Sequence, residues 1–110
     1  MNLVVVDTRL ITDWDSFHEV FARAFGFPAY YGRNMDAWID CMTTLNDPLG
    51  SDTTLFVSPG EIVVLQLEHA GDFERRCPEI YSALIESSAF VNHRLVEQGH
   101  PPALALAWRE

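Results

Sequence analysis

Residues 30–42 read YYGRNMDAWIDCM, and this stretch carries the most information in the 110-residue chain. Asn34 is a favourable helix N-cap, because its side-chain oxygen can accept a hydrogen bond from a free backbone N–H group of the first turn. Asp36 and Asp40 fall on one side of this helix at about 100° per residue. The opposite, apolar side consists of Met35, Trp38, Ile39, Met42 and Leu45. The stretch therefore predicts an amphipathic helix from Asn34 to about Leu45 that presents two carboxylates to solvent.

The presence of both carboxylates is not explained by the stability of the helix. Like charges four residues apart on a helix destabilise it by roughly a few tenths of a kcal/mol. The helix dipole favours Asp36 near the N-terminus, but it does less for Asp40 in the middle. A rigid pair of acids can accept bidentate hydrogen bonds from arginine or lysine of a partner. From these residues alone, the acidic face could be a binding surface or an ordinary solvated helix face.

The flanking sequence predicts strands that alternate with helices. The apolar run from Leu3 to Val6 predicts a strand that is buried on both faces. Thr12 or Asp13 can begin a helix with an aromatic stripe, and Gly26 ends it. Downstream, we expect a strand over 62–67, a helical turn over 72–76, a long helix over 79–98 and a last strand over 103–108.

These elements predict a small α/β fold in one domain over residues 1–110. Because the strands are separated by helices, we expect a three-stranded parallel sheet packed with three to four helices. Residues 46–61 look like a loop, in which 54–57 could form an extra edge strand.

Charge and composition narrow the classes of function. Sixteen acids against seven arginines and no lysine give a net charge of −9, which disfavours direct binding to nucleic acid or to anionic membranes and favours a basic partner. We see no signal-peptide pattern at the N-terminus and no run long enough for a membrane span. Cys41 and Cys77 are too few for a disulfide framework, so we expect a cytoplasmic protein with reduced thiols.

The pattern Tyr-Tyr-Gly-x-Asn-x-Asp-Ala-x-x-Asp-Cys in residues 30–41 resembles the signature of the barstar family, intracellular inhibitors of secreted guanyl-specific ribonucleases. The order of the expected elements is similar to the family fold over nearly the whole chain. The resemblance implies a non-catalytic inhibitor that blocks a basic ribonuclease, with the acids in the place of RNA phosphates. The partner-binding residues that it implies are Tyr30, Gly32, Asn34, Asp36, Asp40 and Leu45.

The chain departs from the family pattern at several positions. Arg33 stands where barstar has an acid, and Ile39 stands where it has a tryptophan. Barstar also uses an acid on its last long helix, where an ungapped count from Gly99 gives Arg94, although Glu86 or Glu97 would fit another register. The segment 46–61 is longer than in barstar. These differences leave the identity of the target open.

Two other functions are alternatives to the ribonuclease inhibitor. The same fold could serve as an antitoxin or regulatory binding protein for a different basic partner. A small hydrolase would need Asp36 and Asp40, or Cys41 with His18 or His69, in a cleft, but acids on an exposed convex helix are poorly placed for acid–base chemistry. We expect no cofactor and no metal site. The inhibitor hypothesis further predicts that Asp36 and Asp40 are exposed, lie close to Tyr30 and have no arginine partners within the chain.

Overall fold

A three-stranded sheet and four α-helices make up the fold. The computed structural model describes residues 2–47, 52–55 and 57–110. In chain order, the elements are β1 (Asn2–Asp7), the short 3-10 helix η1 (Thr8–Leu10), α1 (Trp14–Phe25), α2 (Met35–Met42), β2 (Val63–Glu68), α3 (Ala70–Arg76), α4 (Pro78–Glu97) and β3 (Leu104–Arg109).

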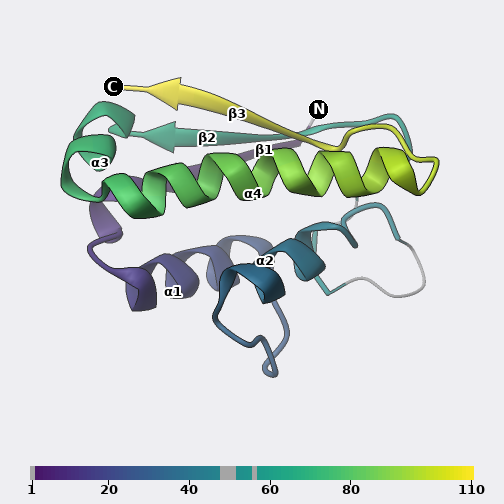
Figure 1. The fold of residues 1–110 in the computed structure, drawn as a ribbon, viewed down its shortest axis with the longest axis horizontal. Helices are drawn as coiled ribbons and strands as arrows, with labels where there is room; N and C mark the ends of the chain where they lie inside the picture. Colours follow the sequence, from purple (N-terminus) through teal and green to yellow (C-terminus); the bar gives the residue numbers. More distant parts are fainter. Residues whose placement is uncertain (1, 48–51, 56) are drawn as a thin grey trace.

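The strands are parallel and lie in the order β1-β2-β3 (Figure 1). Val4 pairs with Leu65, and Leu65 pairs with Leu106, so the register aligns apolar residues across the sheet. Each connection between neighbouring strands contains at least one helix, as parallel pairing requires. The predicted α/β class and parallel sheet are therefore confirmed.

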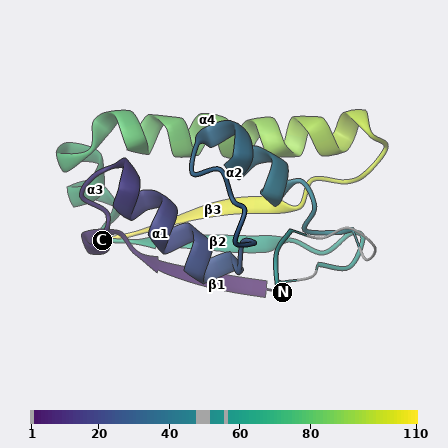
Figure 2. The ribbon, with the colours of Figure 1, turned by 90° about the horizontal axis from the view of Figure 1, so that it is seen from below.

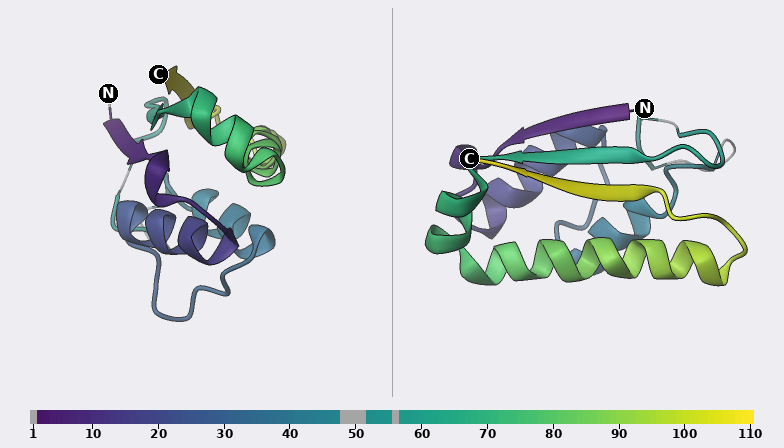
Figure 3. Two further views of the ribbon diagram at one scale, coloured as in Figure 1. Left: turned by 90° about the vertical axis from the view of Figure 1, so that its left-hand side faces the viewer. Right: turned by 90° about the horizontal axis from the view of Figure 1, so that it is seen from above.

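The helices lie on one side of the sheet. Seen from below, α1 and α2 lie across the sheet and α4 runs along its β3 side (Figure 2). Seen from above, the strands face the viewer, and none of the helices labelled in Figure 1 covers them (Figure 3). Leu3 and Val5 are accordingly 53% and 50% exposed. The expectation that β1 is buried on both faces was wrong, because an apolar run does not reveal how many layers cover it.

Alternate residues of the central strand and the aromatic stripe of α1 form the core. Val63, Leu65 and Leu67 are fully buried. The stripe Phe17, Phe21 and Phe25 packs beneath them, as the spacing predicted. Trp38 of α2 is also fully buried and meets Phe21 edge to face at a centroid distance of 5.7 Å. This contact fixes α2 against α1 and leaves the opposite face of α2 to solvent.

Local signals set the ends of α1 accurately. Asp13 accepts a hydrogen bond from the backbone N–H of Ser16 at 2.8 Å, and the Ser16 hydroxyl bonds back to the Asp13 N–H at 3.0 Å. Gly26 ends the helix in the left-handed conformation, with φ at 66°. In contrast, α2 ends at Met42, three residues before the predicted Leu45, and turns follow it.

The described residues of the loop 46–61 form no strand. Thr54 donates its backbone N–H to the Phe25 carbonyl at 2.9 Å, and Val57 donates to the Leu45 carbonyl at 2.8 Å. These bonds tie the loop to the ends of α1 and α2 rather than to a sheet edge. The suggested edge strand at 54–57 is thus corrected for residues 54, 55 and 57, while residue 56 lies outside the described residues.

Within the residues that the structure describes, no helix combines the length and the apolar character needed to traverse a lipid bilayer.

Candidate functional site

The loop before α2 is shaped by its own side chains. Asn34 caps the helix by accepting the Ala37 N–H at 2.8 Å, and its amide donates to the Gly32 carbonyl at 3.3 Å. Arg33 adopts a left-handed backbone conformation, with φ at 54°. Its guanidinium turns back to α1, where it donates to the Asp15 carbonyl at 3.1 Å. Gly32 and Asn34 are exposed just before the first turn of α2, and Asn34 is the N-cap that the sequence predicted.

Asp36 and Asp40 both lie on the exposed face of α2. Asp36 stands in the first turn, where the helix dipole favours a carboxylate, and it forms no ion pair with the described residues. Arg33 does not neutralise either acid, because its closest ion-pair contact is with Glu19 at 3.6 Å.

Asp40 has a cationic partner within the chain, contrary to the expectation. Nη1 of Arg94, on α4, donates to Oδ1 of Asp40 at 2.7 Å. The Asp40 side chain remains 68% exposed, so its second oxygen is still open to a partner. Helix α2 lies against α4, which brings together residues that are 54 positions apart in the sequence. The ion pair is exposed and therefore contributes only about 0–1 kcal/mol to folding.

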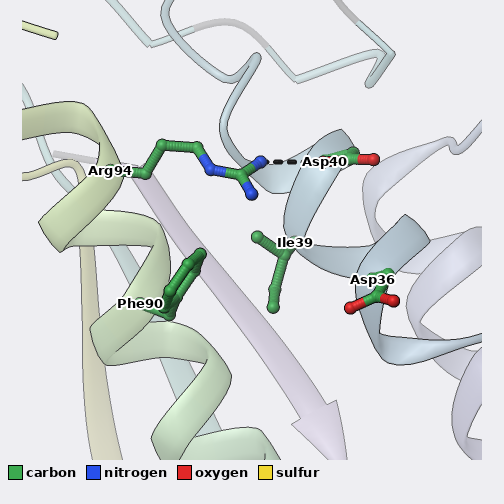
Figure 4. Close-up of a pocket in the computed structure, with 5 residues that line it drawn as sticks. All are labelled: Asp36, Ile39, Asp40, Phe90 and Arg94. Atoms are coloured by element: carbon green, nitrogen blue, oxygen red, sulfur yellow. Dashed lines mark hydrogen bonds and ion pairs between the residues drawn. The ribbon is translucent and has the colours of Figure 1, made fainter.

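A shallow hollow of about 410 Å³ opens between α2 and α4 (Figure 4). Asp36, Ile39 and Asp40 line its α2 side, and Phe90 and Arg94 line its α4 side. The guanidinium of Arg94 lies 5.3 Å from the centre of the Phe90 ring, a distance at which a cation is attracted by an aromatic face. The hollow thus combines two acids, one cation and an apolar floor.

Tyr30 projects from the same loop and is 77% exposed. Its hydroxyl donates to the Asp52 carboxylate at 2.7 Å, and this contact raises the pKa of Tyr30. Asp52 is held in turn by its backbone N–H, which donates to the Thr44 hydroxyl at 2.9 Å. Sequence reasoning missed Asp52, because nothing in a loop of unpredicted shape indicates a contact 22 positions away. At least this part of the loop 46–61 borders the candidate site.

Leu45 does not belong to the exposed surface. Its side chain is fully buried, and its carbonyl accepts the bond from Val57 described above. The expected contact of Leu45 with a partner is therefore corrected. Leu45 lies on the apolar side that the helical spacing assigned to it, although α2 ends three residues before it. Trp38 and Met42 are fully buried as predicted, and they hold α2 in place.

The cysteine next to Asp40 is not set up as a nucleophile. Cys41 is 5% exposed, and burial raises the pKa of its thiol to about 11, with a smaller contribution from the charges of Asp52 and Asp40. His18 does not pair with it, because Nδ1 of His18 lies 2.5 Å from the Tyr31 hydroxyl. Within residues 2–47, 52–55 and 57–110, no group of three or more His, Cys, Asp or Glu residues could hold a metal ion.

Comparison with known proteins identifies a family and a curated relative. The family model described as "Barstar (barnase inhibitor)" matches residues 1–107. A protein of Bacillus subtilis (strain 168) with the name "Putative ribonuclease inhibitor YrdF" is 37% identical over 43 residues. That alignment covers 39% of this chain and 47% of the relative, so the chain spans about half the length of the curated relative it matches.

Proposed function

Because the chain belongs to the barstar family, we propose that it is a protein inhibitor that blocks the active site of a basic guanyl-specific ribonuclease. The binding surface consists of Tyr30, Gly32, Asn34, Asp36 and Asp40. The observation that carries this proposal is the pair of exposed carboxylates on α2, a helix whose other face is anchored by the buried Trp38. The protein acts in this role without catalysis.

The carboxylates take the part of RNA phosphates. A ribonuclease active site presents cations to bind phosphate, and carboxylates accept charge-assisted hydrogen bonds from the same groups. Close charge pairs in the barnase–barstar complex, the founding complex of this family, couple by about 1.5–7 kcal/mol. An ion pair that stays exposed to water contributes only about 0–1 kcal/mol. The two acids therefore contribute strongly to binding only where the partner's cations pair with them and exclude water.

The whole molecule assists the encounter. With a net charge of −9, it attracts a basic protein over distances of about a Debye length, roughly 8 Å at physiological salt. The inhibitor acts in the cytoplasm, where Cys41 and Cys77 stay reduced and where it protects the cell that makes the nuclease. An antitoxin for a different basic toxin is the second candidate, and Arg94 favours it, because it places a cation among the acids.

An RNA-cleavage assay tests the proposal. Purified protein is titrated into a panel of guanyl-specific ribonucleases that includes barnase and any nuclease encoded beside this chain. We expect stoichiometric loss of cleavage for at least one enzyme, and no cleavage by the protein alone. Absence of inhibition across the panel would favour the second candidate. RNA cleavage by the protein alone would contradict a non-catalytic role.

A further inference from the structure

Arg94 is a cation at the centre of a surface that otherwise offers acids. It reaches from α4 toward Asp40, and the Phe90 ring lies beneath its guanidinium (Figure 4). The side chain is only 34% exposed. The ion pair on one side and the aromatic ring on the other fix the guanidinium beside the hollow between α2 and α4.

The ion pair leaves most of the guanidinium available. Arginine carries five N–H donors in a planar fork. Only Nη1 of Arg94 forms a hydrogen bond within the described part of the chain, and the other two nitrogens, Nε and Nη2, have no protein acceptor there. The contact with Asp40 therefore orients Arg94 without saturating it.

A partner that covers this surface must satisfy both signs of charge. Once water is excluded, a cation that binds Asp40 lies next to Arg94 and is repelled by it. A guanidinium that is desolvated without enough acceptors is also costly. Both costs fall if the partner brings an acceptor of negative charge to the free edge of Arg94, and a carboxylate matches the planar fork with two parallel hydrogen bonds.

We propose that Arg94 determines partner specificity by binding a carboxylate of the partner, while Asp36 and Asp40 bind cations beside it. The inference rests on the function proposed above, and it specifies which class of ribonuclease this protein binds and inhibits. The cognate enzyme carries an acid at the rim of its cationic active site, in the position that faces α4. Enzymes that present only cations there bind weakly.

A purely structural ion pair is the alternative. If Arg94 merely ties α4 to α2, its loss alters thermal unfolding and leaves affinity unchanged. The two roles are therefore separated by measuring both quantities on the same variants.

The test uses the ribonuclease that the natural protein inhibits in the panel assay, with Arg94→Gln and Arg94→Glu as variants. Arg23→Gln is the matched control, because Arg23 also forms an ion pair, with Glu19 at 3.0 Å, but on α1 away from the hollow. We expect Arg94→Gln to weaken binding by at least about tenfold and Arg94→Glu by more, while the control stays within about twofold. Reversing the charge of one carboxylate of the nuclease should restore binding to Arg94→Glu.

The other outcomes overturn the inference in distinguishable ways. Equal or tighter binding by Arg94→Gln would refute it while the inhibitor function stands. Weaker binding without any nuclease carboxylate that couples to residue 94 would also refute it. If the Arg94 variants inhibit a panel enzyme that the natural protein does not, Arg94 blocks binding rather than recruiting an acid. If neither the natural protein nor the Arg94 variants inhibit any enzyme of the panel, the proposed function is refuted and the inference is refuted with it.

Discussion

His18 is a histidine in the core, beneath the loop that carries the candidate site. It is 3% exposed, and its ring lies 5.5 Å from that of Tyr31 and 5.1 Å from that of Phe17. Burial lowers the pKa of His18, the charge of Arg33 lowers it further, and Asp15 opposes the shift. The neutral ring therefore shares a hydrogen bond with the Tyr31 hydroxyl, whichever of the two groups donates the proton.

Stability should depend on the ionisation of His18. Since the pKa is lower in the folded protein than the ordinary value of 6.5, the unfolded chain binds the proton more readily. The free energy of unfolding is then highest above about pH 6.5 and falls as the pH drops below it. Denaturant unfolding between pH 7.5 and pH 5 measures this slope.

The control for that prediction exchanges each of two histidines for glutamine. His18→Gln should flatten the pH dependence, while His100→Gln, at an exposed position, should keep it. An unchanged slope in His18→Gln would show that other groups control the acid sensitivity.

Two residues on α2 show what the sequence could and could not predict at this scale. The exposure of Asp36 and Asp40 followed from helical periodicity alone. The partner of Asp40 did not, because Arg94 is brought to it only by the packing of α4 against α2. The helical spacing placed Leu45 on the buried side correctly, whereas the partner contact that the family resemblance implied does not fit a fully buried side chain.

At the level of elements, α2 depends on its N-cap. Asn34 is the residue that both starts the helix and holds the preceding loop through the Gly32 carbonyl. This helix has only eight residues, so it depends strongly on its cap and on packing.

Asn34→Ala should therefore lower the free energy of unfolding by about 1 kcal/mol, within a range of roughly 0.5–2 kcal/mol for lost caps. Asn34→Asp should restore the cap, because a carboxylate oxygen can accept the Ala37 N–H as well. Chemical denaturation of both variants measures the effect. Equal stability of Asn34→Ala and the natural protein would mean that packing alone positions α2.

Elements with local signals were predicted well, and those fixed by tertiary contacts were not. The capping box of Asp13 and the left-handed Gly26 mark the two ends of α1, and both can be recognised from the local sequence. The described residues 54, 55 and 57 do not join the sheet: Thr54 donates its backbone N–H to the last residue of α1, and Val57 donates to Leu45, just after α2. A residue with high β-propensity forms a strand only where a neighbouring strand is available for pairing, so tertiary contacts can override the propensity.

At the scale of the whole molecule, the fold separates two surfaces. The helices cover one face of the sheet, and α2 lies in the helical layer, on the side opposite the open face of the sheet (Figures 1 and 3). The alternation of strands and helices was enough to predict a parallel sheet, but the number of layers was not encoded in any single segment. The open face of β1 is the clearest example.

If the acidic side of α2 binds a cationic enzyme, the loss of one of its carboxylates weakens that binding, and the dissociation constant of Asp36→Ala for the inhibited ribonuclease measures this loss. Asp36 is a better probe than Asp40, because Asp36 forms no ion pair with the described residues, whereas the loss of Asp40 would leave Arg94 without its ion-pair partner. Glu74→Ala on α3 is the control, with the same change in charge at another exposed site. We expect Asp36→Ala to weaken binding by at least about 2 kcal/mol, roughly 30-fold, and the control to bind like the natural protein. Binding by Asp36→Ala as tight as that of the natural protein would contradict this role of α2.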